Sequence, residues 1–178
     1  MNFIRTIEQL AENLDDSDPL EHVKIMKRIR IEAKEIAAFN TWSKQAYTRN
    51  CLARTDAYEI ILLSWDINAK TAIHGHGGEN CWVYQVAGTV VEQRYERQGD
   101  ALKETKRLSL VPGKLTYMND HMGYHSISNM STQRAMTLHI YASPIDSCKV
   151  YNFQKTCFEL KELSYHTFKG NEVTTAIY

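Results

Sequence analysis

The sequence has no excess of charge of one sign, because 21 lysine and arginine residues balance 21 aspartate and glutamate residues. Without a basic excess to neutralise phosphates, nucleic acid is not an expected partner. Long apolar runs are also missing. The run over residues 60–63 falls far short of the ~20 residues that a membrane-spanning helix needs, so we expect no membrane partner either.

Paired cysteine motifs are absent too. The four cysteines, Cys51, Cys81, Cys148 and Cys157, include no C-x-x-C spacing, which favours reduced thiols over a disulfide framework. The first residues are mixed in character and unlike a secretory signal peptide, so we expect a cytoplasmic protein. No internal repeat, low-complexity tract or interdomain linker is recognisable. The length of 178 residues suits a single domain over residues 1–178.

Helices are expected over residues 1–44. One apolar stripe on a 3.6-residue period consists of Phe3, Ile7, Leu10 and Leu14. Asp18 is a suitable N-cap and Pro19 suits a first helical turn, so a second helix should begin there. The side chains expected on its buried face are Val23, Ile29, Ala33, Ile36 and Ala37. We interpret both faces as packing against a sheet rather than as partner-binding surfaces.

Over residues 45–178 the pattern changes to short β-like runs separated by turn residues. The expected strands are residues 58–65, 81–86, 89–95 and 135–142. Ala87-Gly88 looks like a tight hairpin turn between the second and third of these runs, and Gly99-Asp100 and Pro112-Gly113 end later ones. Short strands about ten residues apart predict a mainly β fold, a small β-barrel with helices at its N-terminus.

Three of the seven histidines carry the main chemical signal. His74 and His76 are separated by one residue, so on a strand their side chains would point to the same face. His125 lies in a later run and could supply a third nitrogen from a facing strand. An H-x-H pair arising by chance on a solvent-facing strand is the alternative. The spacing alone does not decide between the two, so the metal hypothesis depends on the surrounding sequence.

The residues around these histidines resemble the two-part signature of the cupin superfamily. His74-Gly75-His76, then Gly88 twelve residues later, then His125 and Asn129, stand in the order of that signature. The general pattern has a glutamate ligand five residues after the second histidine, where this chain has Cys81. With three histidines kept and the carboxylate replaced, the sequence resembles the cysteine dioxygenase type I family.

Further motifs of that family follow in the same order over residues 47–148. They are Tyr47-Thr48-Arg49-Asn50, Trp65, Tyr117-Met118-Asn119-Asp120 and the segment over residues 138–148. The resemblance implies a cupin fold, with a small β-barrel or jelly-roll over residues 45–178 and the helices of residues 1–44 ahead of it.

The resemblance also implies one Fe(II) per chain and no organic cofactor, with His74, His76 and His125 as ligands. Three neutral imidazoles suit Fe(II) and leave positions for substrate and oxygen. Without a protein carboxylate, a thiolate can bind while the complex stays near neutrality, and coordination deprotonates the thiol. Zinc accepts the same nitrogens and is the alternative metal. His121 lies close to His125 but matches a non-ligand position.

Roles in the substrate pocket follow from the same resemblance. Arg49 would hold a carboxylate through two parallel hydrogen bonds, with Tyr47 assisting. Thr137, His139 and Tyr141 alternate along one strand, so they face the same way and can form a relay. Tyr141 would present its hydroxyl to oxygen or substrate, with His139 as its support. Ordinary cross-strand packing is the alternative, and the family usually has serine where Thr137 stands.

In eukaryotic-type members, the cysteine that matches Cys81 forms a thioether with the tyrosine that matches Tyr141, whereas many bacterial relatives carry glycine. The resemblance therefore implies a Cys81–Tyr141 cross-link. The alternative is a buried thiol that behaves as a small hydrophobe. Cys148 matches a position near the site entrance. The family's Ser-Pro-Pro is Ala142-Ser143-Pro144 here, so a cis peptide common in that turn would precede Ser143, be lost, or move to Ser143–Pro144.

Together these motifs imply a cytoplasmic Fe(II)-dependent dioxygenase that converts L-cysteine and O2 to L-cysteine sulfinic acid, a step of cysteine catabolism in the taurine and sulfinate pathway. We expect it to act as a monomer. The alternatives are a dioxygenase of 3-mercaptopropionate or another small thiol, and a non-catalytic cupin that binds a small acid. Glutamine in place of Arg49 is typical of the former and the latter has no need of Tyr141, so the sequence favours cysteine.

Overall fold

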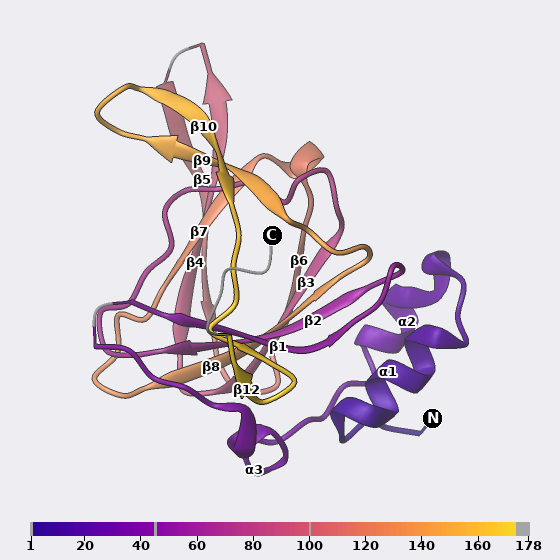
Figure 1. Cartoon of the computed structure of the whole chain (residues 1–178). Helices are drawn as coiled ribbons and strands as arrows, with labels where there is room; N and C mark the ends of the chain where they lie inside the picture. Colours follow the sequence, from indigo (N-terminus) through magenta and orange to yellow (C-terminus); the bar gives the residue numbers. More distant parts are fainter. Residues whose placement is uncertain (1, 45, 100, 174–178) are drawn as a thin grey trace.

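The computed structural model describes residues 2–44, 46–99 and 101–173, in which short helices precede a set of β-strands (Figure 1). The α-helices are α1 (Ile7–Asp15), α2 (His22–Met26) and α3 (Ala33–Ile36), and the 3-10 helices are η1 (Pro19–Glu21), η2 (Ala37–Phe39) and η3 (Asp120–Met122). The strands are β1 (Thr48–Arg54), β2 (Glu59–Trp65), β3 (Cys81–Ala87), β4 (Val90–Gln98), β5 (Ala101–Leu110), β6 (Leu115–Met118), β7 (Tyr124–Ser128), β8 (Ala135–Tyr141), β9 (Ser147–Asn152), β10 (Cys157–Glu162), β11 (Thr167–Phe168) and β12 (Asn171–Glu172). The predicted fold class, mainly β with helices at the N-terminus, is confirmed.

The first helix follows the predicted stripe except at its start. Ile7, Leu10 and Leu14 are buried in α1, and the Thr6 hydroxyl caps the helix by accepting from the backbone N–H of Gln9 at 3.2 Å. Phe3 lies before the helix and is 48% exposed, so its predicted burial is wrong. The chain before the cap is extended, which reverses the faces and turns Phe3 outward.

The second helical segment is broken, a point that the sequence alone left open. Asp18 caps its start as expected, accepting from the backbone N–H of Leu20 at 2.8 Å, but α2 ends at Met26 and α3 begins only at Ala33. Between them the chain pairs with residue 4, since the N–H of Arg30 donates to the carbonyl of Ile4 at 2.7 Å. The packing face of α2 is formed by His22, Ile25 and Met26. Val23 and Ala37 are exposed, contrary to prediction, whereas Ile29 and Ile36 are buried.

Three sheets form the β part of the molecule. The large sheet has seven strands in the order β12-β11-β1-β2-β8-β3-β6, the small sheet has three in the order β5-β4-β7, and β9 pairs with β10. Neighbours are antiparallel except β1 and β11, which are parallel. The large and small sheets face each other across an apolar cluster that includes Leu63, Val83, Val90 and Ile127.

The predicted hairpin at Ala87-Gly88 is wrong. Strand β3 pairs with β8 and β6, and β4 pairs with β5 and β7, so the chain crosses from one sheet to the other at this turn. Gly88 has φ 67°, and a Cβ there would lie 2.5 Å from the carbonyl oxygen of Arg134. Only glycine therefore fits this corner. The hairpin that does form joins β4 to β5 after Gly99, and Asp100 of that predicted turn lies outside the described residues.

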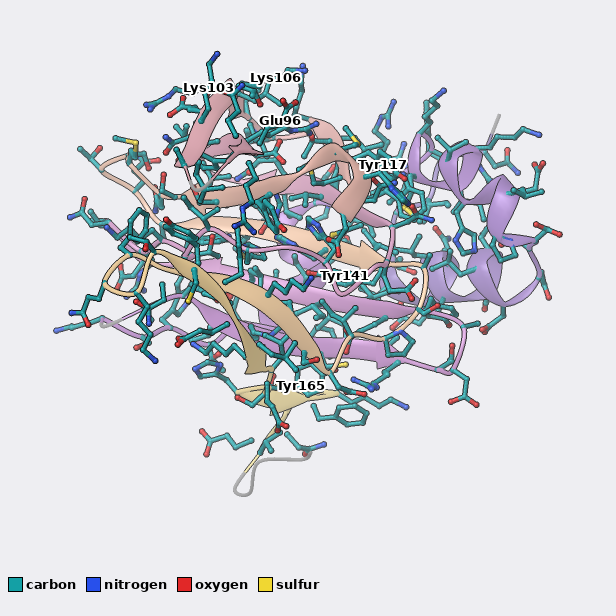
Figure 2. All side chains as sticks on the ribbon, turned by 90° about the horizontal axis from the view of Figure 1, so that it is seen from above. Glu96, Lys103, Lys106, Tyr117, Tyr141 and Tyr165 are labelled. Carbon is teal, nitrogen blue, oxygen red and sulfur yellow. The ribbon has the colours of Figure 1, made fainter. Side chains whose placement is uncertain are left out.

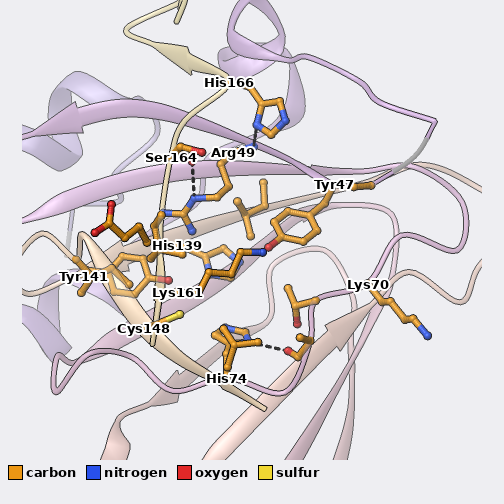
Figure 3. Close-up of a pocket in the computed structure, with 18 residues that line it drawn as sticks. Tyr47, Arg49, Lys70, His74, His139, Tyr141, Cys148, Lys161, Ser164 and His166 are labelled. Carbon is orange, nitrogen blue, oxygen red and sulfur yellow. Dashed lines mark hydrogen bonds between the residues drawn. The ribbon is translucent and has the colours of Figure 1, made fainter. Parts of the chain in front are cut away.

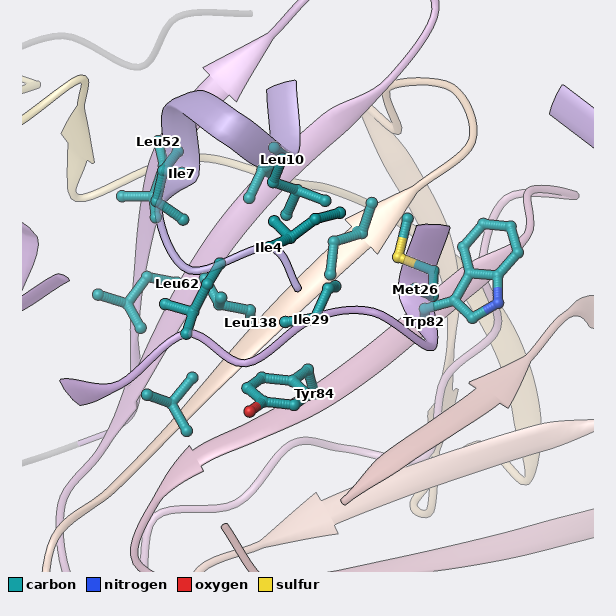
Figure 4. Packing of buried hydrophobic residues seen from close by; sticks show 14 of the residues in the cluster. Ile4, Ile7, Leu10, Met26, Ile29, Leu52, Leu62, Trp82, Tyr84 and Leu138 are labelled. Carbon is teal, nitrogen blue, oxygen red and sulfur yellow. The ribbon is translucent and has the colours of Figure 1, made fainter. Parts of the chain in front are cut away.

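The central strands are buried on both faces. Every residue of β2 and β8 is buried, because the N-terminal helices cover one face of the large sheet and the small sheet covers the other. Figure 4 shows Leu10 and Ile29 of the N-terminal segment packed near Leu62 and Leu138 of the sheet. The prediction that the helical stripes pack against a sheet is confirmed.

The edge strand of the small sheet is charged instead of apolar. Lys103 and Lys106 are exposed on β5, and Figure 2 shows them at the outside of the molecule beside Glu96, while Tyr141 lies within. Charged side chains on an edge strand discourage pairing with another chain. None of the helices in the described ranges is long and apolar enough to cross a membrane.

Candidate active site

His74 and His76 lie in an extended segment rather than in a regular strand. The backbone of His74 exchanges two hydrogen bonds with His125 of β7, at 2.9 and 3.0 Å. On the other side, the N–H of Gly75 donates to the carbonyl of Lys149 in β9 at 2.9 Å. The segment therefore bridges β7 and β9, and its extended form gives both side chains the same direction, as the spacing predicts.

The three imidazoles converge on one point. Nε2 of His76 and Nε2 of His125 lie 3.1 Å apart, and the ring centroids of His74 and His125 are 4.6 Å apart. One ligand atom from each ring lies within 4.8 Å of the other two. Two nitrogens bound to one metal at about 2.1 Å, with angles of about 90–110°, would lie about 3.0–3.4 Å apart. The close pair of nitrogens therefore fits a metal ion.

Hydrogen bonds on the outer side of two rings fix their orientation. Nδ1 of His74 donates to the carbonyl of Ala72 at 2.9 Å, and Nδ1 of His125 donates to Oε1 of Glu92 at 2.9 Å. Because these acceptors have no proton to give, each Nδ1 carries the ring hydrogen and each Nε2 has a free lone pair. Both rings therefore present the tautomer that a metal ligand requires.

Asp120 holds the loop that follows His76. Its carboxylate accepts from the backbone N–H groups of His76 at 2.5 Å and Gly78 at 2.8 Å. The nearby ring of His76, together with these N–H donors, lowers the pKa of Asp120 to about 2. The carboxylate is therefore charged at neutral pH and keeps the segment in place.

Burial keeps two of the rings neutral. Desolvation lowers the pKa of both His74 and His125 well below the usual value of 6.5, and the neighbouring histidines lower it further. A neutral imidazole is the form that binds a metal. These two rings are therefore ready to bind a metal ion at neutral pH without first losing protons.

A cavity of about 390 Å³ opens beside the cluster. Its lining includes Tyr47, Arg49, His74, His139, Tyr141 and Cys148. Figure 3 shows Arg49, Tyr47 and Tyr141 pointing toward one another above His74. The structure thus brings the predicted substrate residues and one predicted metal ligand to the wall of the same cavity, with His76 and His125 buried beside His74.

The chain after β10 holds Arg49 in place. Nε of Arg49 donates to the carbonyl of Ser164 at 3.2 Å, and its backbone N–H donates to Nδ1 of His166 at 3.1 Å. Nη2 of Arg49 is buried and has no hydrogen-bond partner. A buried guanidinium nitrogen without a partner is costly, which makes this atom a candidate contact for an acceptor on a ligand.

A hydrogen-bonded chain runs along β8. Nε1 of Trp65 donates to the hydroxyl of Thr137 at 2.9 Å, and this hydroxyl has its own hydrogen to donate to Nε2 of His139 at 3.0 Å. Burial lowers the pKa of His139, so the ring is neutral and carries its proton on Nδ1. Within the described residues no hydrogen bond links His139 to Tyr141, so the chain ends at His139 and the predicted relay does not reach Tyr141.

Cys81 and Tyr141 are direct neighbours across the sheet. They are Cα partners in the antiparallel pair of β3 and β8, and each side chain perturbs the pKa of the other. Burial raises the pKa of both groups, so thiol and phenol are protonated. All four cysteines are unpaired, and Cys157 alone among them is exposed. The described peptide bonds are all trans, including Ser143–Pro144.

Several residues of the site were not predicted from the sequence. Glu92, Ser164 and His166 each bond to a predicted site residue. Glu92 could have been found, because it occupies an inward position of β4 between the buried Val90 and Arg94, where a charged residue is unusual. Ser164 and His166 carry no local signal, since their partner lies more than a hundred residues earlier, at 115 and 117 positions.

The facing sheets and the three-histidine cluster define a cupin with a metal site. A model of the family described as "Cysteine dioxygenase type I" matches residues 1–154. The chain belongs to the cysteine dioxygenase type I family of the cupin superfamily. This membership and the histidine cluster support a thiol dioxygenase.

Individual relatives are distant in sequence but similar along most of their length. "Cysteine dioxygenase type 1" of Homo sapiens is 26% identical over 176 residues, which cover 95% of this chain and 86% of that protein. The protein of the same description from Danio rerio is 24% identical and covers 85% of this chain and 78% of its own length. The crystal structure of a Thermus thermophilus protein described only as "TT1209" matches with a TM-score of 0.52 at 18% identity, over 63% of this chain and 97% of that chain. This last likeness concerns the fold alone.

Proposed function

We propose that this protein is an Fe(II)-dependent dioxygenase that oxidises L-cysteine with O2 to L-cysteine sulfinic acid, in cysteine catabolism. The observation that carries the proposal is the unpartnered Nη2 of Arg49 in the same cavity as His74. A thiol donor and a carboxylate on one small molecule match these two features. A single domain over residues 1–178, a monomeric state and a cytoplasmic location belong to the same proposal and rest on the sequence alone.

His74, His76 and His125 would hold one iron per chain, and no organic cofactor is needed. Bound iron would supply the redox chemistry that adds both atoms of O2 to the sulfur of a thiol, so no external reductant would be required. The absence of a carboxylate from the three ligands suits an anionic thiolate. Zinc accepts the same three nitrogens but has no redox chemistry, so it would give an inactive protein.

Arg49 would bind the substrate carboxylate. Its Nε is occupied by the Ser164 carbonyl, which leaves Nη2 directed at the ligand and fixes the plane of the guanidinium. A planar fork that is already oriented loses little entropy when it binds a carboxylate. Burial raises the pKa of Tyr47, so its hydroxyl is protonated in the same cavity and can donate a second hydrogen bond to the carboxylate.

Tyr141 would hold a proton at the phenol oxygen and donate a hydrogen bond to substrate or oxygen. Burial raises the pKa of this phenol well above its usual value, so the proton stays in place at neutral pH. His139 would support the wall of the pocket next to it, and the chain from Trp65 through Thr137 fixes the orientation of the imidazole.

Cys81 and Tyr141 would form a thioether in the course of turnover. The S–H bond of Cys81 and a C–H bond ortho to the phenol hydroxyl of Tyr141 break, and an S–C bond forms. Two protons and two electrons leave, and O2 accepts the electrons. The position of the two residues as Cα partners in adjacent strands supports this reaction. The bond would fix the ring and remove a free thiol that competes for the metal.

The test is oxygen uptake by protein reconstituted with Fe(II), with cysteine, 3-mercaptopropionate and cysteamine offered separately and the sulfinate identified by mass spectrometry. Cysteine is expected to give uptake and sulfinate. Preference for 3-mercaptopropionate or cysteamine would replace the proposed substrate with another small thiol. No uptake with any thiol would leave a non-catalytic cupin that binds a small acid. Replacement of His74, His76 or His125 by alanine is expected to abolish both iron binding and uptake.

Arg49→Ala tests whether Arg49 binds the substrate carboxylate without taking part in the oxidation itself. Loss of a charged hydrogen-bond partner costs about 1.5–3 kcal/mol, which lowers kcat/KM for cysteine by about 10–150-fold. Cysteamine lacks the carboxylate and is expected to be indifferent to the change. Arg107→Ala, at an exposed arginine on β5, is the matched control and is expected to leave both substrates unaffected. Equal losses for cysteine and cysteamine would show that Arg49 does not contact the carboxylate.

A further inference from the structure

A buried polar group lies behind His125, on the side away from the cavity. It consists of Glu92 and Arg94 on β4 and Thr116 on β6. Glu92 is fully buried, and Arg94 and Thr116 are each 8% exposed. Charged residues are almost never buried to this extent unless they are paired, and here the pair stands next to a candidate metal ligand.

The contacts divide the carboxylate of Glu92 between two partners. Oε1 accepts from Nδ1 of His125 at 2.9 Å. Oε2 accepts from the Thr116 hydroxyl at 3.0 Å and from Nη2 of Arg94 at 3.2 Å. The same Nη2 donates to the Thr116 hydroxyl at 2.6 Å and to the carbonyl of Tyr117 at 2.9 Å. One oxygen therefore faces the imidazole and the other faces the guanidinium.

The two charges act on His125 in opposite directions. A carboxylate that accepts the Nδ1 hydrogen draws this proton toward itself, which makes Nε2 a stronger electron donor. A guanidinium on the far oxygen withdraws negative charge from the carboxylate and weakens that effect. Arg94 also lies directly opposite His125 in the β4–β7 pair, so its positive charge lies on the same face of the sheet as the ring.

Stability alone does not account for the arrangement. Buried ion pairs can often be replaced by apolar side chains at no loss of stability, because two charges must be desolvated. Nε of Arg94 is buried with no hydrogen-bond partner, which adds a further cost. The group is therefore poorly suited to a purely structural role but is well placed to act on the ring of His125.

We propose that Glu92 and Arg94 are positioning residues that set the donor strength of His125 toward the metal, Glu92 raising it and Arg94 limiting it. Neither residue touches metal or substrate. The inference rests on the proposed function for the metal, and on the contacts above for the opposing action of the two charges. Its signature is a pair of substitutions with opposite effects, which a structural role cannot produce.

The experiment compares wild-type protein with Glu92→Gln and Arg94→Met. Dissociation constants for Fe(II) and Co(II) are measured without oxygen, and the Fe(III)/Fe(II) potential is measured by redox titration. Glu92→Gln is expected to weaken metal binding about 10–100-fold and to make the potential more positive. Arg94→Met is expected to tighten binding and to make the potential more negative. Arg94→Lys keeps the charge and is expected to restore the wild-type potential.

Glu104→Gln and Arg107→Met provide matched controls, because these residues form an exposed ion pair on β5 at 2.9 Å. Both are expected to leave the potential unchanged. If Arg94→Met does not fold, Arg94→Gln removes the charge while keeping a donor for the Tyr117 carbonyl, and it takes the same place in the comparison. Unfolding of the metal-free proteins in urea identifies variants whose weaker binding only reflects lost stability.

The outcomes separate this inference from the proposed function. A wild-type protein that binds no Fe(II) and oxidises no thiol overturns the proposed function. A wild-type protein that does both, but in which Glu92→Gln and Arg94→Met shift the potential in the same direction or not at all, overturns the inference alone. Opposite shifts of the potential in Glu92→Gln and Arg94→Met, with no shift in the two controls on β5, support the inference.

Discussion

Thr137→Val is the change that best tests the hydrogen-bonded chain on β8. Valine has nearly the shape of threonine but no hydroxyl, so it removes two contacts at once. Nε1–H of Trp65 loses its acceptor and Nε2 of His139 loses its donor. Trp65 and Thr137 are fully buried and His139 is 3% exposed, so water cannot replace the hydroxyl without opening the barrel.

The expected loss of stability follows from these two orphaned groups. Each buried polar group left without a partner costs about 1–3 kcal/mol, which gives about 2–6 kcal/mol for Thr137→Val. Thr137→Ser is the matched control, because it keeps the hydroxyl and removes one methyl group at a cost of about 1 kcal/mol. The free energy of unfolding of a natural domain is about 5–15 kcal/mol, so the valine variant should still fold.

The measurement is urea unfolding of the metal-free proteins, followed by tryptophan fluorescence. The free energy of unfolding falls by about 2 kcal/mol per M of urea. The urea concentration at the unfolding midpoint should therefore fall by about 1–3 M in Thr137→Val and by about 0.5 M in Thr137→Ser. Turnover of the iron-loaded proteins should fall in the valine variant and persist in the serine variant. If the Thr137→Val variant proves as stable and as active as Thr137→Ser, the hydroxyl of Thr137 does not bridge Trp65 and His139.

Two further predictions concern the cross-link and the helical layer. After extended turnover with cysteine, the intact mass should fall by two hydrogens, and peptide mapping should find Cys81 and Tyr141 in one linked peptide. The Cys81→Gly variant should stay unlinked and active at a lower rate. Separate Cys81 and Tyr141 peptides after turnover would contradict the thioether. Burial lowers the pKa of His22 below 6.5, so the unfolded chain binds more protons there and unfolding becomes easier as the pH falls through this value. His22→Gln should flatten the loss of stability as the pH falls below 6.5, and an unchanged pH dependence of the free energy of unfolding in urea would refute the role of His22.

Local patterns predicted the strands of the large sheet well. Residues 58–65 and 135–142 were expected as strands, and they form β2 and β8. Their apolar and branched side chains need burial on two faces, which only the centre of a sheet provides. The prediction of a hairpin at Gly88 was wrong because a turn signal is local and strand pairing is not. A glycine turn between two strands fixes the bend, but it does not determine which neighbours the strands pair with.

The helical segment shows the same limit. The stripe of α1 was correct over residues 7–14, where the helix continues for its full length. Val23 lies in α2 but outside its packing face, which is formed by His22, Ile25 and Met26. At Phe3 the prediction failed because pairing between Ile4 and Ile29 keeps the chain extended. That contact spans 25 positions and has no signature in either segment alone.

The candidate site could be predicted in its members but not in its geometry. Spacing and the family resemblance indicated the three histidines and Arg49, and the structure brings His74 and Arg49 to one cavity. The proton positions on the rings depend on Ala72 and Glu92, whose roles follow from the folded register. The Ala72 carbonyl has no signal in the sequence, and the inward position of Glu92 indicates a buried charge but not which residue it contacts.

The charges around the cavity argue for a substrate with two anionic groups. Arg54 is neutralised locally, because it pairs with Glu59 at 3.1 Å and with Asp146 at 2.7 Å. Arg49 keeps a buried nitrogen without a partner, so its positive charge remains for a ligand. The rings of His74 and His125 are neutral, so these two ligands bring no negative charge of their own to a divalent metal. Under the proposed function, a thiolate at the metal and a carboxylate at Arg49 would supply negative charge at both points, which a thiol without a carboxylate would not do.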